Sequence, residues 1–363
     1  MPIRSRIANE RPAGWTSRRK ALVAAAALIP IGLALTTVSS ATAQPAQHGP
    51  SVISNGPSAI SNAAAAGTYA VAPYVDMGES TESLLNTALT SKGLKAYTAA
   101  FVIGEGCSQE WGDTEPIGGD PYIDPEIAKA KSEGGSVIIS SGGADGYSIP
   151  WTCTNQSTIN SSLQKIITTY GAKALDFDIE GAAVADTTSA TRLYSAMKTL
   201  KASNPGLVFS ITIPVTPTGM DNYGVGLVQA AHNAGVKIDV VNLMAMDYYA
   251  GTGEEMGTAA INAAKGTLAQ LKAIDSSYSY ANVGLTPMIG VNDDGSTFTL
   301  ADANTVESFA ASNGLARLSF WSLTRDQSCG GSAAQAIASP ASSPTCSGVS
   351  QSSLAYTSAF AKY

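Results

Sequence analysis

Three carboxylic acids alternate with apolar residues in the stretch LDFDIEG, residues 175–181. Side chains of an extended strand point alternately to two faces, so Asp176, Asp178 and Glu180 share one face. Burying several carboxyl groups together leaves some of them protonated or strongly hydrogen-bonded. Acids held in different protonation states suit general acid and base chemistry. The alternative is a buried polar network that serves only packing.

The acids lie in a chain of repeated strand and helix patterns. Eight apolar runs recur about every 35 residues, with helical spacing between them, and this alternation predicts a parallel sheet covered by helices. Eight such units predict an α/β fold, a (β/α)8 TIM barrel with a single catalytic domain. No Gly-x-Gly-x-x-Gly follows the first run, which disfavours an open dinucleotide-binding sheet. The expected strands lie within residues 69–77, 96–104, 135–143, 174–181, 207–215, 238–249, 282–290 and 316–323.

The expected helices carry their own start and stop signals. In the segment 114–135, Pro125 suits a first helical turn and Gly134 a C-terminal cap. Another helix is expected from Thr188 onward and ends at Asn204-Pro205-Gly206.

A barrel gives the acidic stretch a defined place. Leu175, Phe177 and Ile179 would pack outward on helices, while the acids would face the interior and Glu180 would reach the C-terminal end of the barrel. Barrel enzymes place catalysis at that end, and barrel interiors are otherwise filled by branched apolar side chains. We therefore favour a catalytic site over a structural network.

Four motifs in strand order resemble the chitinases of glycoside hydrolase family 18. Residues 176–180 resemble that family's Asp-x-Asp-x-Glu signature, and Ser140-Ser141-Gly142-Gly143 is similar to its Ser-x-Gly-Gly. The stretch MAMDYY, residues 244–249, is similar to its Met-x-Tyr-Asp region, and Trp321 to its barrel-floor tryptophan. The resemblance spans about residues 69–325 and is specific because the four motifs occur together.

The resemblance implies a retaining, substrate-assisted hydrolysis of β-1,4-linked N-acetylglucosamine, without a cofactor or a metal. Glu180 would protonate the glycosidic oxygen and then deprotonate water. The substrate's own N-acetyl carbonyl would attack the anomeric carbon, and Asp178 would stabilise the resulting oxazolinium. Asp176 would share a proton with Asp178.

The same resemblance implies substrate contacts. Trp321 would form an apolar floor under the sugar, or be a core tryptophan. Asp247 would hydrogen-bond the sugar, or be a solvated loop acid. Tyr74 and Ser140 are expected to hydrogen-bond Asp176, or to be core hydroxyls satisfied elsewhere. The other expected contacts are Gly142, Gly143, Met244, Met246, Tyr248 and Tyr223, and the stacking platforms Trp111 and Trp151, whose alternative is packing in their loops.

The chain departs from the family pattern in three places. Lys173-Ala174 stand where the longer signature begins with Asp-Gly, and Met246 stands where the family has a tyrosine. Tyr248 or Tyr223 could supply the missing hydroxyl. The segment 289–303 is too short for an inserted domain. We therefore expect an open groove and internal attack on long chains.

Three other functions use similar residues. An endo-β-N-acetylglucosaminidase that cleaves glycoprotein glycans would need the same acids. A non-catalytic lectin on the same barrel would usually lack the terminal acid, and Glu180 is present. A glycosidase with two catalytic carboxylates normally takes its nucleophile from a different strand than its acid, which disfavours this reading.

Composition narrows the class of partner. The 363 residues carry a net charge of −7, with 13% charged and 44% hydrophobic residues, which is typical of a soluble globular protein. Basic residues concentrate at the start, and the acidic remainder argues against nucleic-acid or anionic-membrane binding. We expect a monomer whose partner is chitin or a chitooligosaccharide.

The first 43 residues have the pattern of an export signal. Residues 18–20 are basic, residues 21–35 are apolar, and Ala41-Thr42-Ala43 suits cleavage after Ala43. The apolar run is shorter than the roughly 20 residues that span a bilayer, which disfavours a membrane anchor. The arginine pair would also fit twin-arginine export. The expected division is 1–43 signal peptide, 44–67 flexible Ala/Ser/Asn/Pro leader, and 68–363 catalytic domain of a secreted protein.

All four cysteines lie in the exported part, where oxidising conditions favour disulfides. Four cysteines allow three pairings, and we predict Cys107 with Cys153 and Cys329 with Cys346 because each pair falls in neighbouring expected loops. Zinc binding is the alternative. It is disfavoured because the chain has only two histidines and no Cys-x-x-Cys spacing.

Overall fold

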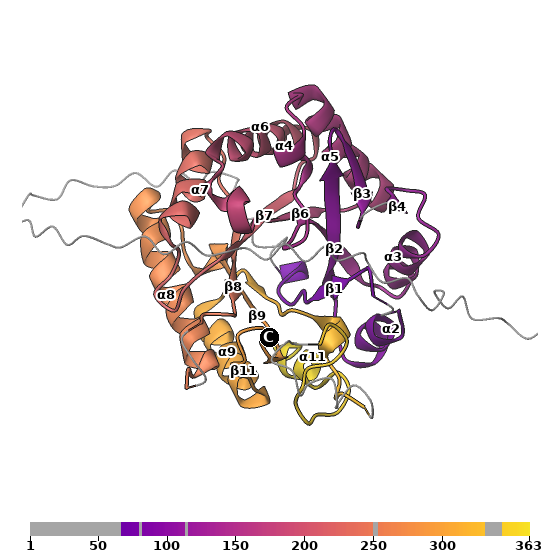
Figure 1. The fold of residues 1–363 in the computed structure, drawn as a ribbon, viewed down its shortest axis with the longest axis vertical. Coiled ribbons are helices and arrows are strands. Elements are labelled where there is room, and N and C mark those ends of the chain that lie inside the picture. Colours follow the sequence, from indigo (N-terminus) through magenta and orange to yellow (C-terminus); the bar gives the residue numbers. More distant parts are fainter. Residues whose placement is uncertain (1–66, 80–81, 113–114, 250–252, 331–342) are drawn as a thin grey trace, which may run out of the picture.

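The computed structural model describes residues 67–79, 82–112, 115–249, 253–330 and 343–363. Figure 1 shows the strands at the centre and the helices around them, with chain order running around the ring from indigo to yellow. The central sheet has ten strands, eight of which form the barrel. The barrel strands are β1 (Tyr74–Asp76), β2 (Ala96–Glu105), β5 (Ser136–Gly142), β6 (Ala174–Asp178), β7 (Val208–Pro214), β8 (Val240–Ala245), β9 (Val283–Pro287) and β12 (Arg317–Leu318).

These strands are parallel and form a closed barrel. Each pairs with the next in the order β1, β2, β5, β6, β7, β8, β9, β12. Backbone hydrogen bonds close the ring, from Leu318 N to Ala70 O (2.7 Å) and from Tyr74 N to Phe320 O (3.0 Å). The predicted (β/α)8 barrel is confirmed, and every strand lies within one residue of the run predicted for it.

Helices cover the outside of the barrel where the sequence predicts them. The segment around Pro125 forms a helix that is followed by Gly134 in a left-handed conformation (φ 89°). The helix predicted from Thr188 ends at Ser203, before Asn204. The helices are α2 (Glu82–Ser91), α3 (Ile123–Ser132), α4 (Ile149–Thr152), α5 (Gln156–Tyr170), α6 (Thr187–Ser203), α7 (Asn222–Asn233), α8 (Met256–Ile274), α9 (Leu300–Asn313) and α11 (Ala355–Phe360), with 3-10 turns η1 (Gly181–Ala185), η2 (Tyr280–Asn282) and η3 (Leu323–Arg325).

The barrel strands separate an apolar outer layer from a mixed interior. Leu175, Phe177 and Ile179 of the β6 region are buried, and Phe177 packs edge-on against Phe209. Inside, the N-terminal end of the barrel is filled by small and branched side chains, and polar groups follow toward the C-terminal end. This apolar inner layer consists of Tyr69, Ala72, Ala96, Ile138, Ala174, Val208, Val240 and Ala316.

Two short hairpins extend the barrel. β3 (Ser108–Trp111) pairs with β2 and with β4 (Glu115–Pro116), and β10 (Gly290–Val291) pairs with β11 (Thr297–Phe298). The disulfide Cys107–Cys153 joins the turn between β2 and β3 to the end of α4. A second disulfide joins Cys329 to Cys346. Both predicted pairings are confirmed, and the cysteines are therefore not zinc ligands.

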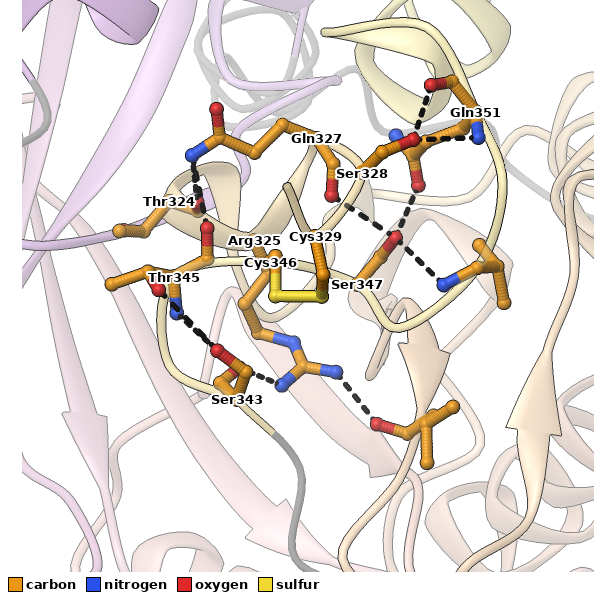
Figure 2. Close-up of a disulfide and its surroundings, with 12 residues drawn as sticks. Thr324, Arg325, Gln327, Ser328, Cys329, Ser343, Thr345, Cys346, Ser347 and Gln351 are labelled. Carbon is orange, nitrogen blue, oxygen red and sulfur yellow. Dashed lines mark hydrogen bonds between the residues drawn. A yellow bond between two sulfur atoms is a disulfide. The ribbon is translucent and has the colours of Figure 1, made fainter. Parts of the chain in front are cut away.

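The second disulfide lies beside an arginine that holds the β10–β11 hairpin (Figure 2). Arg325 is 1% exposed and donates hydrogen bonds to Ile289 O (2.9 Å), Val291 O (2.6 Å) and Ser343 O. The next residue, Asp326, accepts hydrogen bonds from the backbone of Tyr356 and Thr357 in the first turn of α11. The C-terminal segment thereby fixes the loop that follows β9.

Residues 1–66 lie outside the described part of the chain, and with them the predicted export signal and all of the predicted leader except Gly67. In the part that is described, no helix combines the length and the apolar character that crossing a membrane would require.

Candidate active site

The three acids of the β6 region, called here the acid row (Asp176, Asp178 and Glu180), meet side chains from other strands of the barrel. Asp176 is fully buried, Asp178 is 8% exposed, and Glu180 is half-buried just after the strand ends. Exposure therefore increases along the row toward the C-terminal end of the barrel. The partners described below come from β1, β5 and β7, so the row faces the interior as predicted.

Asp176 is surrounded by hydroxyl groups. The hydroxyl cluster consists of Tyr74 (2.8 Å to Oδ2), Ser140 (2.8 Å to Oδ2), Ser210 (2.6 Å to Oδ1) and Thr212 (2.9 Å to Oδ1). An ionised carboxylate has about four lone-pair sites. The cluster can fill all of them. The predicted hydrogen bonds of Tyr74 and Ser140 to Asp176 are present.

The direction of two of these hydrogen bonds is fixed by groups behind the hydroxyls. Arg317 Nη1 donates to Ser210 Oγ (3.0 Å), and a guanidinium has no acceptor. Asn242 Nδ2 donates to Thr212 Oγ1 (3.0 Å), and its amide is oriented by Thr286, which donates to Oδ1. Each hydroxyl therefore uses its own proton for Asp176. Asp176 thus accepts hydrogen bonds on both of its carboxyl oxygens.

Asp178 lies in a different environment. Burial, and then the charges of Glu180 and Asp176, raise its pKa well above the usual aspartate range. Its Oδ1 has no hydrogen-bond partner among the described residues. Burial therefore favours the protonated form of Asp178, and one of its oxygens is free to accept a hydrogen bond.

Two glycines of the third barrel strand allow the backbones to approach at this point. Gly142 has φ 116°, and a Cβ there would lie 2.1 Å from the carbonyl oxygen of Asp178. Gly143 donates its N–H to the same oxygen (3.1 Å), and its own Cβ would lie 2.8 Å from the ring of Phe101. Both positions require glycine. These residues position Asp178 through its backbone.

Glu180 titrates close to neutrality. Burial, and then the charges of Asp145 and Asp247, raise its pKa to about 7. A group with a pKa near the working pH can both donate and accept a proton within one reaction cycle. Glu180 is thus suited to the acid and base role that the sequence suggests.

Asp247, after β8, is anchored to the β10–β11 hairpin. Its carboxylate accepts the N–H of Asp294 (3.1 Å), and its own N–H points to Asn292 Oδ1 (3.4 Å). Its φ of 49° lies in the left-handed region, and burial followed by the charge of Asp293 raises its pKa to about 6. Asp247 is half-buried, so the alternative of a freely solvated loop acid is wrong.

An aromatic cluster links the acid row to the last barrel strand. Trp321 stacks on Phe101, with ring centroids 5.6 Å apart and planes 15° apart. The ring of Tyr74 lies 6.0 Å from both, while its hydroxyl contacts Asp176. Trp321 is half-buried and therefore keeps accessible surface next to the acids. Tyr74 thus connects Trp321 to Asp176 of the acid row.

Comparison with known families supports the grouping of these motifs. A model for glycosyl hydrolases family 18 matches residues 70–319, which is most of the barrel. The chain belongs to this family.

Individual relatives of this family 18 chain share about a third of their residues with it. They include a probable bifunctional chitinase/lysozyme of Escherichia coli, 33% identical over 71% of this chain and 31% of the relative. Endochitinase 11 of Metarhizium anisopliae is 32% identical over 71% of this chain and 52% of the relative. This chain thus spans about a third and about half of these curated relatives.

A solved structure has the same fold. Catalytic site mutants of active domain 2 of the thermostable chitinase from Pyrococcus furiosus, complexed with chito-oligosaccharides, match with a TM-score of 0.71. The identity is 32%, and the match covers 81% of this chain and 94% of that one.

The two tryptophans predicted as outer stacking platforms lie differently. Trp111 is 1% exposed and donates its indole N–H to the hydroxyl of Tyr170 (2.7 Å). Its prediction as a platform is wrong, because both faces are packed in the protein. Trp151 is half-buried and donates to Ala183 O (3.2 Å) in η1, directly after Glu180. Its role as a platform remains a prediction.

The residues predicted to replace the family tyrosine differ in exposure. Tyr223, at the start of α7, is 59% exposed. Tyr248 is half-buried, its hydroxyl has no partner among the described residues, and burial raises its pKa. Met244 and Met246 are both half-buried at the end of β8. Tyr248 is the better candidate, since its hydroxyl is buried and has a free hydrogen-bonding capacity.

Sequence reasoning missed several groups of this family 18 site. Ser210 and Thr212 alternate with apolar residues in LVFSITIPV, with the same period of two as the acids, so a signal for them was present. Asn242, Arg317 and Asp145 carry no such pattern. They are found only because the barrel brings their strands and loops to the acid row.

Proposed function

We propose that this protein is a secreted chitinase that hydrolyses β-1,4-N-acetylglucosamine linkages in chitin and chitooligosaccharides with retention of configuration. The observation that carries the proposal is the acid row, in which Asp176 accepts hydrogen bonds from the hydroxyl cluster, burial raises the pKa of Asp178, and burial raises the pKa of Glu180 to about 7. The relatives add support, since those described above are named as chitinases and one was crystallised with chito-oligosaccharides.

The first chemical step cleaves the glycosidic bond. Glu180 gives its proton to the glycosidic oxygen, the bond from that oxygen to the anomeric carbon breaks, and the substrate's N-acetyl oxygen bonds to the same carbon. Asp178 accepts the acetamido N–H on its free Oδ1 and turns its proton toward the Glu180 carboxylate. The positive oxazolinium then lies among anionic groups, which lowers its energy.

The second step returns the site to its starting state. Glu180, now a carboxylate, takes a proton from water, and the water oxygen bonds to the anomeric carbon while the bond to the N-acetyl oxygen breaks. Two displacements at one carbon retain its configuration. Trp321 forms the apolar floor beneath the sugar ring, since its indole is half-buried next to Tyr74.

Chain cleavage is internal, and the protein acts outside the cell. Only the small β10–β11 hairpin occupies the segment between β9 and α9, so no inserted domain walls the site there. The N-terminal pattern of residues 1–43 directs export with cleavage after Ala43, and the two disulfides suit an oxidising compartment.

The test is the anomer released from a soluble chitin tetramer, followed by proton NMR, together with inhibition by a thiazoline mimic of the oxazolinium. We expect the β-anomer first and strong inhibition. Release of the α-anomer, or indifference to the mimic, contradicts substrate assistance. Cleavage of a high-mannose glycoprotein but not of the tetramer would indicate an endo-β-N-acetylglucosaminidase, and binding without cleavage a lectin.

The matched variant is Glu180→Gln, which keeps the size of the side chain but removes its acid and base function. We expect kcat to fall about 10²–10⁴-fold while oligomer binding is retained, because positioned acid–base catalysis contributes about that much. Unchanged turnover in this variant would exclude Glu180 as the acid.

A further inference from the structure

A cation is buried inside the barrel next to the acid row. Arg317, the first residue of β12, is 1% exposed, and its Nη1 lies 3.8 Å from Asp176 Oδ1. Removing a guanidinium from water is costly unless its hydrogen bonds are satisfied. Within the described residues, Nε and Nη2 of Arg317 have no hydrogen-bond partner.

The contact between the two charges passes through one hydroxyl. Arg317 Nη1 donates to Ser210 Oγ (3.0 Å), which in turn donates to Asp176 Oδ1 (2.6 Å). The serine proton is thereby directed at Asp176. The positive charge and the orientation of the hydroxyl both favour the ionised form of Asp176.

The electrostatic effect of Arg317 decreases along the acid row, from Asp176 to Glu180. Residues two apart on one strand face are separated by roughly 7 Å, so Asp178 and then Glu180 lie progressively farther from Arg317. The other charged or titratable groups around Arg317 are Tyr74, Tyr69 and Asp239, and those around Glu180 are Asp145 and Asp247. Arg317 is the cation of this set, and it stands at the inner end of the row.

We propose that Arg317 is a positioning residue that determines which acid holds the proton. It keeps the negative charge on Asp176, so that the proton stays on Asp178 and can be presented to Glu180. Arg317 also stabilises the Asp176 carboxylate while Asp178 contacts the substrate. This inference rests on the proposed function, because it assigns a role within the same catalytic site.

The burial of Arg317 agrees with this role. Burial lowers the pKa of Arg317, and the charge of Asp176 is the largest influence in the opposite direction. The two charges thus stabilise each other inside the barrel. Because an arginine keeps its proton under nearly all conditions, the countercharge does not change during the reaction.

The test compares two variants of Arg317 by the pH dependence of kcat/KM on a chitin oligomer. Arg317→Met removes the charge at similar length, and Arg317→Lys keeps it. We expect the acidic limb of the Met variant to move up by about one pH unit, a tenfold loss at a fixed acidic pH, because Asp176 then takes up a proton more easily. The limb of the Lys variant should stay near that of the unmodified protein.

The matched control is Lys173→Met, which removes an exposed cation directly before β6. Solvent screens that charge, so we expect no shift of the profile. If Arg317→Met lowers kcat/KM by the same factor at every pH, Arg317 serves only packing and the inference is overturned. A shift as large in Lys173→Met as in Arg317→Met would overturn it as well.

A second measurement needs no Arg317 variant and remains decisive if these fail to fold. Carboxyl ¹³C NMR of aspartate-labelled protein, with assignment through Asp178→Asn, reports which carboxyl group carries the proton at neutral pH. We expect Asp176 ionised and Asp178 protonated, and the reverse would overturn the inference. Failure of the unmodified protein to cleave chitin oligomers would instead contradict the proposed function, while this spectrum would still show which of the two aspartates carries the proton.

Discussion

The two ends of the acid row are built in opposite ways. At the inner end, Asp176 is fully buried, its side-chain hydrogen-bond partners are hydroxyls, and its ion-pair partner is Arg317. At the outer end, Glu180 is half-buried and its charged neighbours Asp145 and Asp247 are acids. The inner end holds one negative charge in place, and the outer end raises proton affinity.

Backbone geometry follows the same division. Asp176 lies in a regular strand, paired in register with Ser140 and Ser210. Near the outer end, Asp247 and Tyr249 have φ of 49° and 54°, which non-glycine residues rarely adopt. The backbone N–H of Asp247 donates to the side chain of Asn292, and that of Tyr249 donates to the side chain of Asp294. These hydrogen bonds hold both residues in this conformation. Non-glycine residues with left-handed backbone geometry thus lie near the outer end, whereas Asp176 lies in regular strand geometry.

The largest expected effect is a difference in stability between two aspartate-to-asparagine substitutions in the acid row. Asp176→Asn places an amide among four hydroxyl donors and beside Arg317, so some donors lose their acceptor. We expect the free energy of unfolding to fall by about 2–5 kcal/mol. Asp178→Asn replaces an acid whose neutral form is favoured by burial with a neutral group of the same shape, and we expect a change below about 1 kcal/mol.

Urea denaturation of both variants at pH 7 measures this difference. Both should lose activity, so activity does not distinguish them, whereas stability does. Equal destabilisation would mean that the two aspartates do not differ in charge, and the contrast between the ends of the row would fail.

A smaller effect is expected where the neighbouring backbone approaches the row. Gly142→Ala would place a methyl group 2.1 Å from Asp178 O at φ 116°, so the two strands must separate. We expect a loss of about 3 kcal/mol in unfolding free energy, combining backbone strain with a steric clash. Gly181→Ala is the control, because Gly181 follows Glu180 at φ 54° with nothing within 4 Å of a Cβ.

The control carries backbone strain alone, so we expect it to cost about 1 kcal/mol. Thermal unfolding measures the stability of the two alanine variants. A fall in kcat of Gly142→Ala would show that the contact between Gly142 and the Asp178 backbone also positions Asp178. Similar losses in both would mean that the close approach of Gly142 contributes nothing to stability.

Much of this site follows from patterns along single strands, and the remainder depends on contacts between strands. The alternation in LDFDIEG predicts a shared face and the barrel predicts its direction, so the acids, Tyr74, Ser140 and Trp321 come together as expected. Arg317 and Asn242 are single polar residues without a repeating pattern, and such residues occur at many positions that have no role in a site. Trp111 is a residue that was predicted for the site but does not belong to it. The sequence does not show that Tyr170 packs against its ring.

The smallest expected effect tests the outer end directly. Asp247→Asn removes a negative charge near Glu180, and a lost anionic neighbour lowers the pKa of an acid. The alkaline limb of kcat/KM, set near pH 7 by protonated Glu180, should therefore move down by about 0.3–1 pH unit. Asp145→Asn is the companion variant. Burial is the largest cause of the raised pKa of Glu180, the charge of Asp145 is the second, and the charge of Asp247 is the third.

Both variants should shift the limb in the same direction, and Asp145→Asn at least as far. An upward shift in either would mean that the acids around Glu180 do not raise its proton affinity. Asp247 also accepts the N–H of Asp294, so Asp247→Asn should in addition raise KM if the hairpin contact positions substrate. Asp145 is exposed, and its variant isolates the charge effect from the change in loop geometry.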